Sequence, residues 1–289
     1  MAQVIQVPTL NDTAYDFERL FAIWSQVNSY SEDVRFDFSH CDFLRPNAVA
    51  FLGGLARLIG WRFGSVEFDW GTCTNSAVMA NLCQNGFAGT FGHSTSAWTG
   101  NSIPYREDEI QNMDGITDYL TESWLGRKWV HVSPLLRDAI VGHMWEIYSN
   151  AFEHSGSEIG VFSCGQHFRR NNELILSVVD FGQGIPAKVR NFLSSDPRAE
   201  QLTAASCLRW AFQSGNSTCT DDIARGLGLD LLRKFIRLNQ GKLEVYSNNG
   251  YVIIDKNGDR YENRGISFEG TLVYITLRCD ENLYSLKGE

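Results

Sequence analysis

The chain has 289 residues, of which 43% are hydrophobic, and this length fits two domains with apolar cores. The net charge of -9 disfavours a nucleic-acid-binding protein, because such proteins neutralise phosphates with clustered Lys and Arg. The seven cysteines include no Cys-x-x-Cys pair, which indicates reduced thiols and neither a disulfide framework nor a zinc site. Neither a signal peptide nor an apolar run of the ~20 residues that span a membrane is present, so we expect a cytoplasmic protein without a membrane partner.

The first 92 residues alternate short strands with helices. Alternating or apolar runs predict strands at 4–7, 34–38 and 65–69, and apolar residues at helical spacing predict helices at 15–27, 47–63 and 76–84. This order predicts a small α/β sandwich. No glycine-rich phosphate-binding motif follows any of these strands, so we expect no nucleotide site in this domain.

Residues 34–52 read VRFDFSHCDFLRPNAVAFL. This segment resembles the corner between the second strand and the next helix of STAS domains, the fold of anti-sigma-factor antagonists. In that family the corner carries a serine that a partner kinase phosphorylates, whereas the matching positions here are Pro46, Asn47 and Ala48. The resemblance therefore implies a STAS-like domain over residues 1–92 that docks or senses without this phosphorylation. A purely structural α/β unit is the alternative.

Residues 93–130 separate the first domain from the second. Residues 94–104 are small and polar and include Gly and Pro, which is typical of a linker. Residues 107–124 carry apolar side chains at helical spacing, which predicts a connecting helix that packs on the second domain or faces a partner. We therefore place a linker and a connecting helix at 93–130 and the second domain at 131–289.

A row of polar side chains lies on the first predicted helix of the second domain. Ser133 and Pro134 form a helix start signal, and apolar residues then recur at three- and four-residue spacing. Glu146, Asn150 and His154 follow one another at four-residue spacing, so their side chains point in roughly the same direction. Unpaired polar groups are costly to bury, so the row is either a solvated helix edge or part of a site.

A short glycine motif follows the next two predicted strands. Strands at 159–168 and 174–180 form a hairpin, and the second ends at Asp180, which is followed by Gly182 and Gly184. The glycines let the backbone approach a flat ligand closely while the carboxylate accepts a hydrogen bond. By itself this motif is also compatible with an ordinary turn.

A second glycine pair opens a later helix. Gly226 and Gly228 stand where free backbone N–H groups and the helix dipole favour phosphate, and Arg225 adds a cation. The polar residues 193–225 before them predict a partly ordered lid. The chain then ends in predicted strand 242–246, a hairpin through 248–250, a turn at 255–258 and strand 272–277, which follows Gly270 and Thr271.

The order of these motifs over residues 133–278 resembles the GHKL ATP-binding domain shared by type II topoisomerases, histidine kinases and anti-sigma-factor serine kinases. The resemblance rests on Glu-x-x-x-Asn-x-x-x-His in a helix, Asp-x-Gly-x-Gly after a strand, Gly-x-Gly opening a helix, and Gly-Thr before the last strand. It implies an α/β fold in which an N-terminal STAS-like sandwich precedes a C-terminal GHKL (Bergerat-type) sandwich. It also implies ATP and Mg²⁺ as cofactors.

The resemblance implies a role for each matching residue. Asn150 matches the ligand of Mg²⁺, Glu146 the general base, and Asp180 the carboxylate that accepts a hydrogen bond from the adenine amino group. The other matches surround the base and the phosphates: Gly182 and Gly184 make room for the base, Arg225, Gly226 and Gly228 hold phosphates, Thr271 lies near the floor of the adenine pocket, and His154 lies near the phosphates or pairs with the dipole of its own helix.

Three kinds of GHKL protein compete. Glu146, the Gly-Leu-Gly-Leu motif and the STAS-like domain favour an ATPase or protein serine/threonine kinase of partner-switching type, acting on a protein partner. A histidine kinase needs a phospho-acceptor histidine in a dimerising helical hairpin, and residues 107–124 contain none. A topoisomerase-like machine needs a following transducer domain, and we expect this class less because only twelve residues follow Leu277. A homodimer remains open, as does an ATP-dependent conformational switch with little or no turnover.

Overall fold

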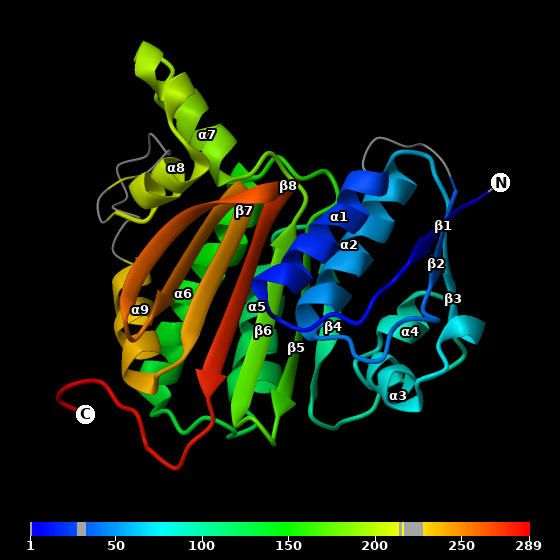
Figure 1. Cartoon of the computed structure of the whole chain (residues 1–289). Helices are drawn as coiled ribbons and strands as arrows, with labels where there is room; N and C mark the ends of the chain where they lie inside the picture. Colours follow the sequence, from blue (N-terminus) through cyan, green and yellow to red (C-terminus); the bar gives the residue numbers. More distant parts are fainter. Residues whose placement is uncertain (1, 28–32, 214–215, 217–227) are drawn as a thin grey trace.

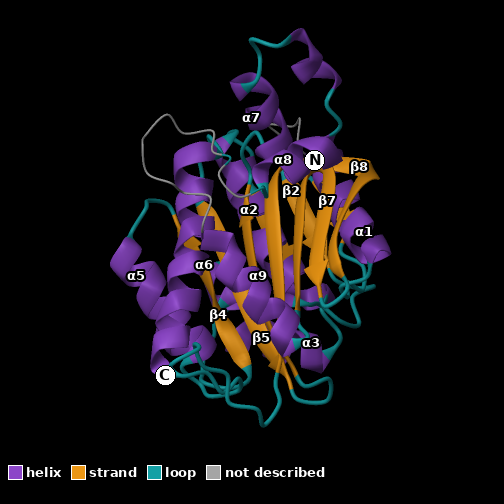
Figure 2. Cartoon of the chain, turned by 90° about the vertical axis from the view of Figure 1, so that its left-hand side faces the viewer, coloured by secondary structure: helices purple, strands orange, loops and turns teal. Residues whose placement is uncertain are grey.

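The computed structural model describes residues 2–27, 33–213, 216 and 228–289. Within these ranges the chain forms a parallel sheet of three strands and an antiparallel sheet of five, with helices packed against both (Figures 1 and 2). The fold is therefore mixed α/β, as expected from the alternating pattern of the sequence.

Residues 2–27 and 33–92, which we call the N-terminal unit, carry the parallel sheet with order β1-β2-β3. The six elements expected here are all present, with small differences at their ends. The bounds are β1 (Gln3–Gln6), α1 (Ala14–Val27), β2 (Val34–Asp37), α2 (Pro46–Trp61), β3 (Val66–Asp69), the 3-10 turn η1 (Trp70–Thr72), α3 (Ser76–Gln84) and α4 (Phe87–Thr90).

Helices α1 and α2 lie between the two sheets (Figure 1). They contact the five-stranded sheet, α2 at β5 and β6 and α1 at β8. This position explains why α2 is buried on almost every side, since most of its residues from Pro46 to Ile59 are shielded from solvent. The N-terminal unit therefore shares one continuous apolar core with the second sheet.

The segment expected to be a linker contributes a strand to the second sheet. Strand β4 (Ser102–Asp108) pairs antiparallel with β5 (Val161–Phe168) at the sheet edge. The expected helix over 107–124 begins only at α5 (Met113–Asp118) and continues as the π-helical segment η2 (Tyr119–Leu125). Pro104 obscured the strand pattern. An edge strand tolerates proline, which lacks a backbone N–H, because an N–H on the outer side of an edge strand has no strand partner to bond.

The antiparallel sheet has the order β4-β5-β6-β8-β7, with β6 at Glu173–Asp180, β7 at Lys242–Asp255 and β8 at Gly258–Arg278. The hairpin expected through 248–250 is wrong, because β7 runs through these residues with a register shift from Ser247 to Gly250. Asn248 takes a left-handed conformation with φ of 50°, which absorbs the irregularity without reversing the chain. The turn expected at 255–258 is confirmed.

The opposite face of this sheet is covered by α6 (Pro134–His154) and α9 (Gly228–Asn239). The Ser133 hydroxyl accepts a hydrogen bond from the Leu136 N–H at 3.3 Å, which caps α6 where its start was expected. Helix α7 (Ile185–Phe192), η3 (Pro197–Gln201) and α8 (Ala204–Ala211) stand at one end of the sheet (Figure 1). No helix of the described residues is long and apolar enough to cross a bilayer.

Candidate functional site

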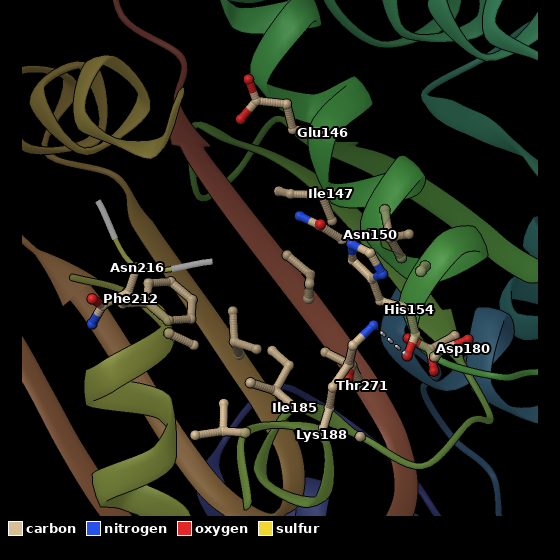
Figure 3. Close-up of a pocket in the computed structure, with 18 of the residues that line it drawn as sticks. Glu146, Ile147, Asn150, His154, Asp180, Ile185, Lys188, Phe212, Asn216 and Thr271 are labelled. Atoms are coloured by element: carbon tan, nitrogen blue, oxygen red, sulfur yellow. Dashed lines mark hydrogen bonds between the residues drawn. The ribbon is translucent and has the colours of Figure 1, made fainter. Parts of the chain in front are cut away.

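A cavity of about 200 Å³ lies between the carboxyl-terminal half of α6, the loop after β6, helices α7 and α8, and the face of the antiparallel sheet (Figure 3). Glu146, Asn150 and His154 line it from α6, and Asp180 and Thr271 line it from β6 and β8. The polar row on α6 therefore faces the same cavity as residues that are far away in the sequence.

The glycines expected at the site are placed in part. Gly184 lines the cavity and Gly182 is buried in the loop beside it. Gly228 is the first residue of α9. Arg225 and Gly226 lie outside the described residues, as do residues 214, 215 and 217–225 of the segment expected to form a lid. The part of that segment that is described forms η3 and α8.

Asp180 is the buried acid of the cavity. Asp180 is 4% exposed, and its backbone partner in the pairing of β6 with β8 is Thr271. One carboxylate oxygen accepts a hydrogen bond from the Gly182 N–H at 3.0 Å. Burial nevertheless raises the pKa of Asp180 to about 7, because the charged form loses hydration. A ligand that donates a hydrogen bond to this carboxylate would favour its ionised form.

The loop after Asp180 lies directly against the end of α6. The Gln183 N–H donates to the Ser155 carbonyl at 2.7 Å, and a Cβ on Gly182 would come within 2.1 Å of the same carbonyl oxygen. Any side chain at position 182 would therefore push the loop away from α6. Gly184 adopts φ of +79°, which favours glycine.

The irregular part of β7 supports the same loop. The Ser247 hydroxyl accepts a hydrogen bond from the Ile185 N–H at 2.8 Å and lies 2.9 Å from the Thr271 hydroxyl. The Asn248 amide donates to the Gln183 carbonyl at 3.1 Å. Neither residue was expected at the site, because a hairpin was predicted through 248–250. The available signal was the polar pair of Ser247 and Asn248 within the strand.

The row on α6 differs in exposure along its length. The Glu146 side chain is 42% exposed, and its carboxylate lies 4.0 Å from the imidazole of His143. Burial lowers the pKa of His143, because the charged imidazolium loses hydration. His154 is the last residue of α6, and its side chain is 19% exposed. That position is compatible with both roles expected for it, contact with phosphates and pairing with the helix dipole.

Two cations that the sequence analysis did not single out also line the cavity. The Lys188 ammonium donates to the His154 carbonyl at 3.4 Å (Figure 3). Arg233 donates to the Phe212 carbonyl at 2.6 Å and lies 3.8 Å from the Asp259 carboxylate. Gly184 precedes α7, and Lys188 lies one helical turn later. This spacing from the glycine motif was the only indication in the sequence that Lys188 would lie near the site.

Apolar side chains form the remaining walls. They come from both sides of the cavity and include Val178, Ile185, Val189, Phe212, Leu243, Val245 and Val273. A flat aromatic ligand would bury apolar surface against them at roughly 25 cal/mol per Å². With Asp180 at the same cavity, the site combines an apolar slot and one buried hydrogen-bond acceptor.

The described residues contain no group of three or more His, Cys, Asp or Glu side chains that could hold a metal ion. A divalent cation in this cavity would therefore need oxygen ligands from a bound molecule and from water. Mg²⁺ is commonly held in this way, through one or two protein oxygens and the phosphates of its substrate. The amide oxygen of Asn150 is a suitable protein ligand for it.

No protein-family model matches this sequence, and no curated protein matches it. The function proposed below therefore rests on the chemistry of the cavity.

Proposed function

We propose that this cavity binds Mg-ATP and that the protein hydrolyses it or transfers its γ-phosphate to a serine or threonine of a protein partner. The proposal assigns residues 131–289 to a GHKL-type ATP-binding domain and residues 1–92 to a STAS-like one. The single observation that carries it is the buried carboxylate of Asp180, which shares a cavity with Glu146 and Asn150.

The base-binding end of the cavity suits adenine. An adenine amino group would donate to Asp180, whereas guanine presents a carbonyl oxygen at the same place. Two facing acceptors in a buried position are costly, so at a pH above the pKa of about 7, where Asp180 is ionised, ATP should be favoured over GTP by about 100-fold or more. Gly182 and Gly184 let the loop beside Asp180 pack closely on Ser155 and Asn248, because a side chain at either position would meet these residues.

The α6 row suits the phosphate end of the cavity. Asn150 would hold Mg²⁺ through its amide oxygen, and the bound ion would offset the charge of the phosphates. Glu146 lies one helical turn earlier and would accept a proton from the attacking water or hydroxyl group. Lys188 adds positive charge to the wall, which favours an anionic ligand, whereas the charge of Arg233 is offset by Asp230 and Asp259.

The binding step can be tested by isothermal titration calorimetry of the full-length chain with ATP and GTP, each in Mg²⁺ and in EDTA. We expect one site that binds ATP more tightly in Mg²⁺ than in EDTA, and GTP binding weaker by about 100-fold. The proposal is falsified if no Mg-dependent ATP binding is measured. Phosphate release at saturating ATP then separates an enzyme from the alternative, an ATP-dependent conformational switch with little turnover.

The metal assignment predicts a specific defect in Asn150→Ala. This variant should bind ATP in EDTA as the wild type does and lose the gain that Mg²⁺ provides, about tenfold in affinity. Asn191→Ala is a matched control, because Asn191 is an exposed amide on α7 and does not line the cavity. A variant at Asn150 that keeps the full Mg²⁺ gain would remove this residue as a ligand.

A further inference from the structure

The strand-to-helix corner of the N-terminal unit is turned inward. Asn47 is 1% exposed, and its amide donates to the Asn11 carbonyl at 3.2 Å. The neighbouring Arg45 lies 3.3 Å from Glu173 of β6 and 3.5 Å from Asp12. Pro46, Asn47 and Ala48, the positions at which the phosphorylated serine was expected to be replaced, are therefore buried inside the chain.

The same interface reaches the loop of the proposed nucleotide site. Phe181 stands between Asp180 and Gly182 and is 7% exposed. Successive side chains of an extended backbone point to opposite faces, which places Phe181 on the α2 side while Asp180 lines the cavity. Its ring centroid lies 5.0 Å from that of Phe51 in α2 and 6.1 Å from that of Phe268 in β8.

Helix α2 approaches this ring with its backbone. A Cβ built on Gly54 would lie 2.4 Å from the Phe181 ring and 2.7 Å from the Phe162 ring. Glycine inside a helix costs about 1 kcal/mol relative to alanine. Its presence here is explained by the space that Phe181 occupies, since any larger residue would displace the ring next to Asp180.

The other wall of the base pocket is held by the same cluster. Phe268 lies three residues before Thr271, and its ring stacks on Phe21 of α1 at 4.6 Å and meets Phe51 of α2 at 5.3 Å. Asp180 and Thr271 are register partners in β6 and β8. The aromatic cluster of Phe21, Phe51, Phe181 and Phe268 therefore supports both strands at the point where they carry these two residues.

We infer that α2 is a positioning element for the base-binding loop, so that the N-terminal unit supports this loop from the opposite face of the sheet and determines how Asp180 is presented to a base. The inference rests on the proposed function for the identity of the ligand. It gives the N-terminal unit a role in ligand affinity and base selectivity through Gly54 and Phe51, residues that do not line the cavity.

The test uses glycine substitutions along α2 in the full-length chain. Gly54→Ala should weaken ATP binding roughly tenfold and reduce the preference for ATP over GTP, because the added methyl group displaces Phe181. Gly60→Ala is the control without a contact, since a Cβ there has nothing within 4 Å. Gly53→Ala is the control for strain, since its Cβ would meet Tyr105 of β4 and not the loop.

A second measurement is independent of ATP. The Asp180 carboxyl can be titrated by NMR in the wild type and in each variant, with Phe51→Leu added as a variant that removes a ring contact without overpacking. Gly54→Ala and Phe51→Leu should shift the titration midpoint of Asp180, whereas Gly60→Ala and Gly53→Ala should leave it unchanged. A positioning role requires this shift, and general destabilisation of the fold does not produce it.

The outcomes separate the two claims. If the wild type binds no ATP, the proposed function fails, and the Asp180 titration still decides whether α2 positions the loop. If the wild type binds ATP but Gly54→Ala matches Gly53→Ala and Gly60→Ala in affinity, selectivity and Asp180 midpoint, the inference is overturned. Circular dichroism and thermal unfolding of each variant establish that the compared proteins are folded.

Discussion

Glu146→Ala is expected to bind Mg-ATP with the affinity of the wild type and to release γ-phosphate about 10²- to 10⁴-fold more slowly. The side chain lines the cavity, is 42% exposed and lies one helical turn from Asn150, so its removal takes away a proton acceptor without disturbing the core. Single-turnover phosphate release, measured beside calorimetric affinity, tests both halves of this expectation.

The control for this substitution is Asp138→Ala. Asp138 is a carboxylate on the same helix, 61% exposed, and it contacts Arg137 outside the cavity. The substitution removes one negative charge from α6 away from the cavity, so the variant should release phosphate at the rate of the wild type. Phosphate release that is unchanged in Glu146→Ala would exclude Glu146 as the general base.

Asp180→Asn is expected to lower ATP affinity by about 100-fold or more while it makes the unliganded protein more stable at neutral pH. Asparagine has one acceptor oxygen, and the Gly182 N–H at 3.0 Å occupies it in the loop. The amide NH₂ would then face the adenine amino group, so two donors would meet. Asp230→Asn is the matched control, because Asp230 lines the same cavity but is paired with Arg233 at 3.7 Å.

The gain in stability follows from the pKa of Asp180. This pKa is about 7 in the folded protein, against the ordinary value of 3.8 for the group in the unfolded chain. Between these values the folded state binds more protons than the unfolded state, so the free energy of unfolding falls as the pH rises from about 4 to 7. The slope is at most about 1.4 kcal/mol per pH unit.

Urea unfolding of the wild type and Asp180→Asn at several pH values between 5 and 8 measures this difference. The variant lacks the titrating group. The amount by which its free energy of unfolding exceeds that of the wild type should therefore grow with pH up to about 7 and then remain constant. Parallel curves for the two proteins would show that Asp180 titrates at its ordinary value. Burying the charged carboxylate would then cost no free energy of folding, and a hydrogen-bond donor on the ligand would have no such cost to offset.

The sequence alone was sufficient for elements whose signals are local. Helix α6 begins at the Ser133 cap, as the start signal indicated, and contains the row from Glu146 to His154, and the elements of the N-terminal unit appear in the expected order. Strand β4 and the irregularity of β7 were missed, because an edge strand with a proline and a bulge depend on the neighbouring strand and not on their own composition.

The candidate site was predictable in its motifs and not in its surroundings. Residues spaced by four on one helix must share a direction, so Glu146, Asn150 and His154 could be grouped from the sequence. Lys188 and Arg233 could not be added to them, because the spacing within α7 or α9 does not say what lies across the cavity. ATP as the ligand remains the proposal to be tested.

What the sequence by itself determined is the α/β class, most of the helices and strands, and a set of polar and glycine residues suited to one site. These follow from hydrophobic period, capping residues and turn chemistry, which act within a few residues. Only the tertiary structure decided that α1 and α2 pack on the second sheet and that Gly54 meets Phe181. The burial of a helix on two opposite faces depends on which surfaces lie across from it, and a one-dimensional pattern does not contain that information.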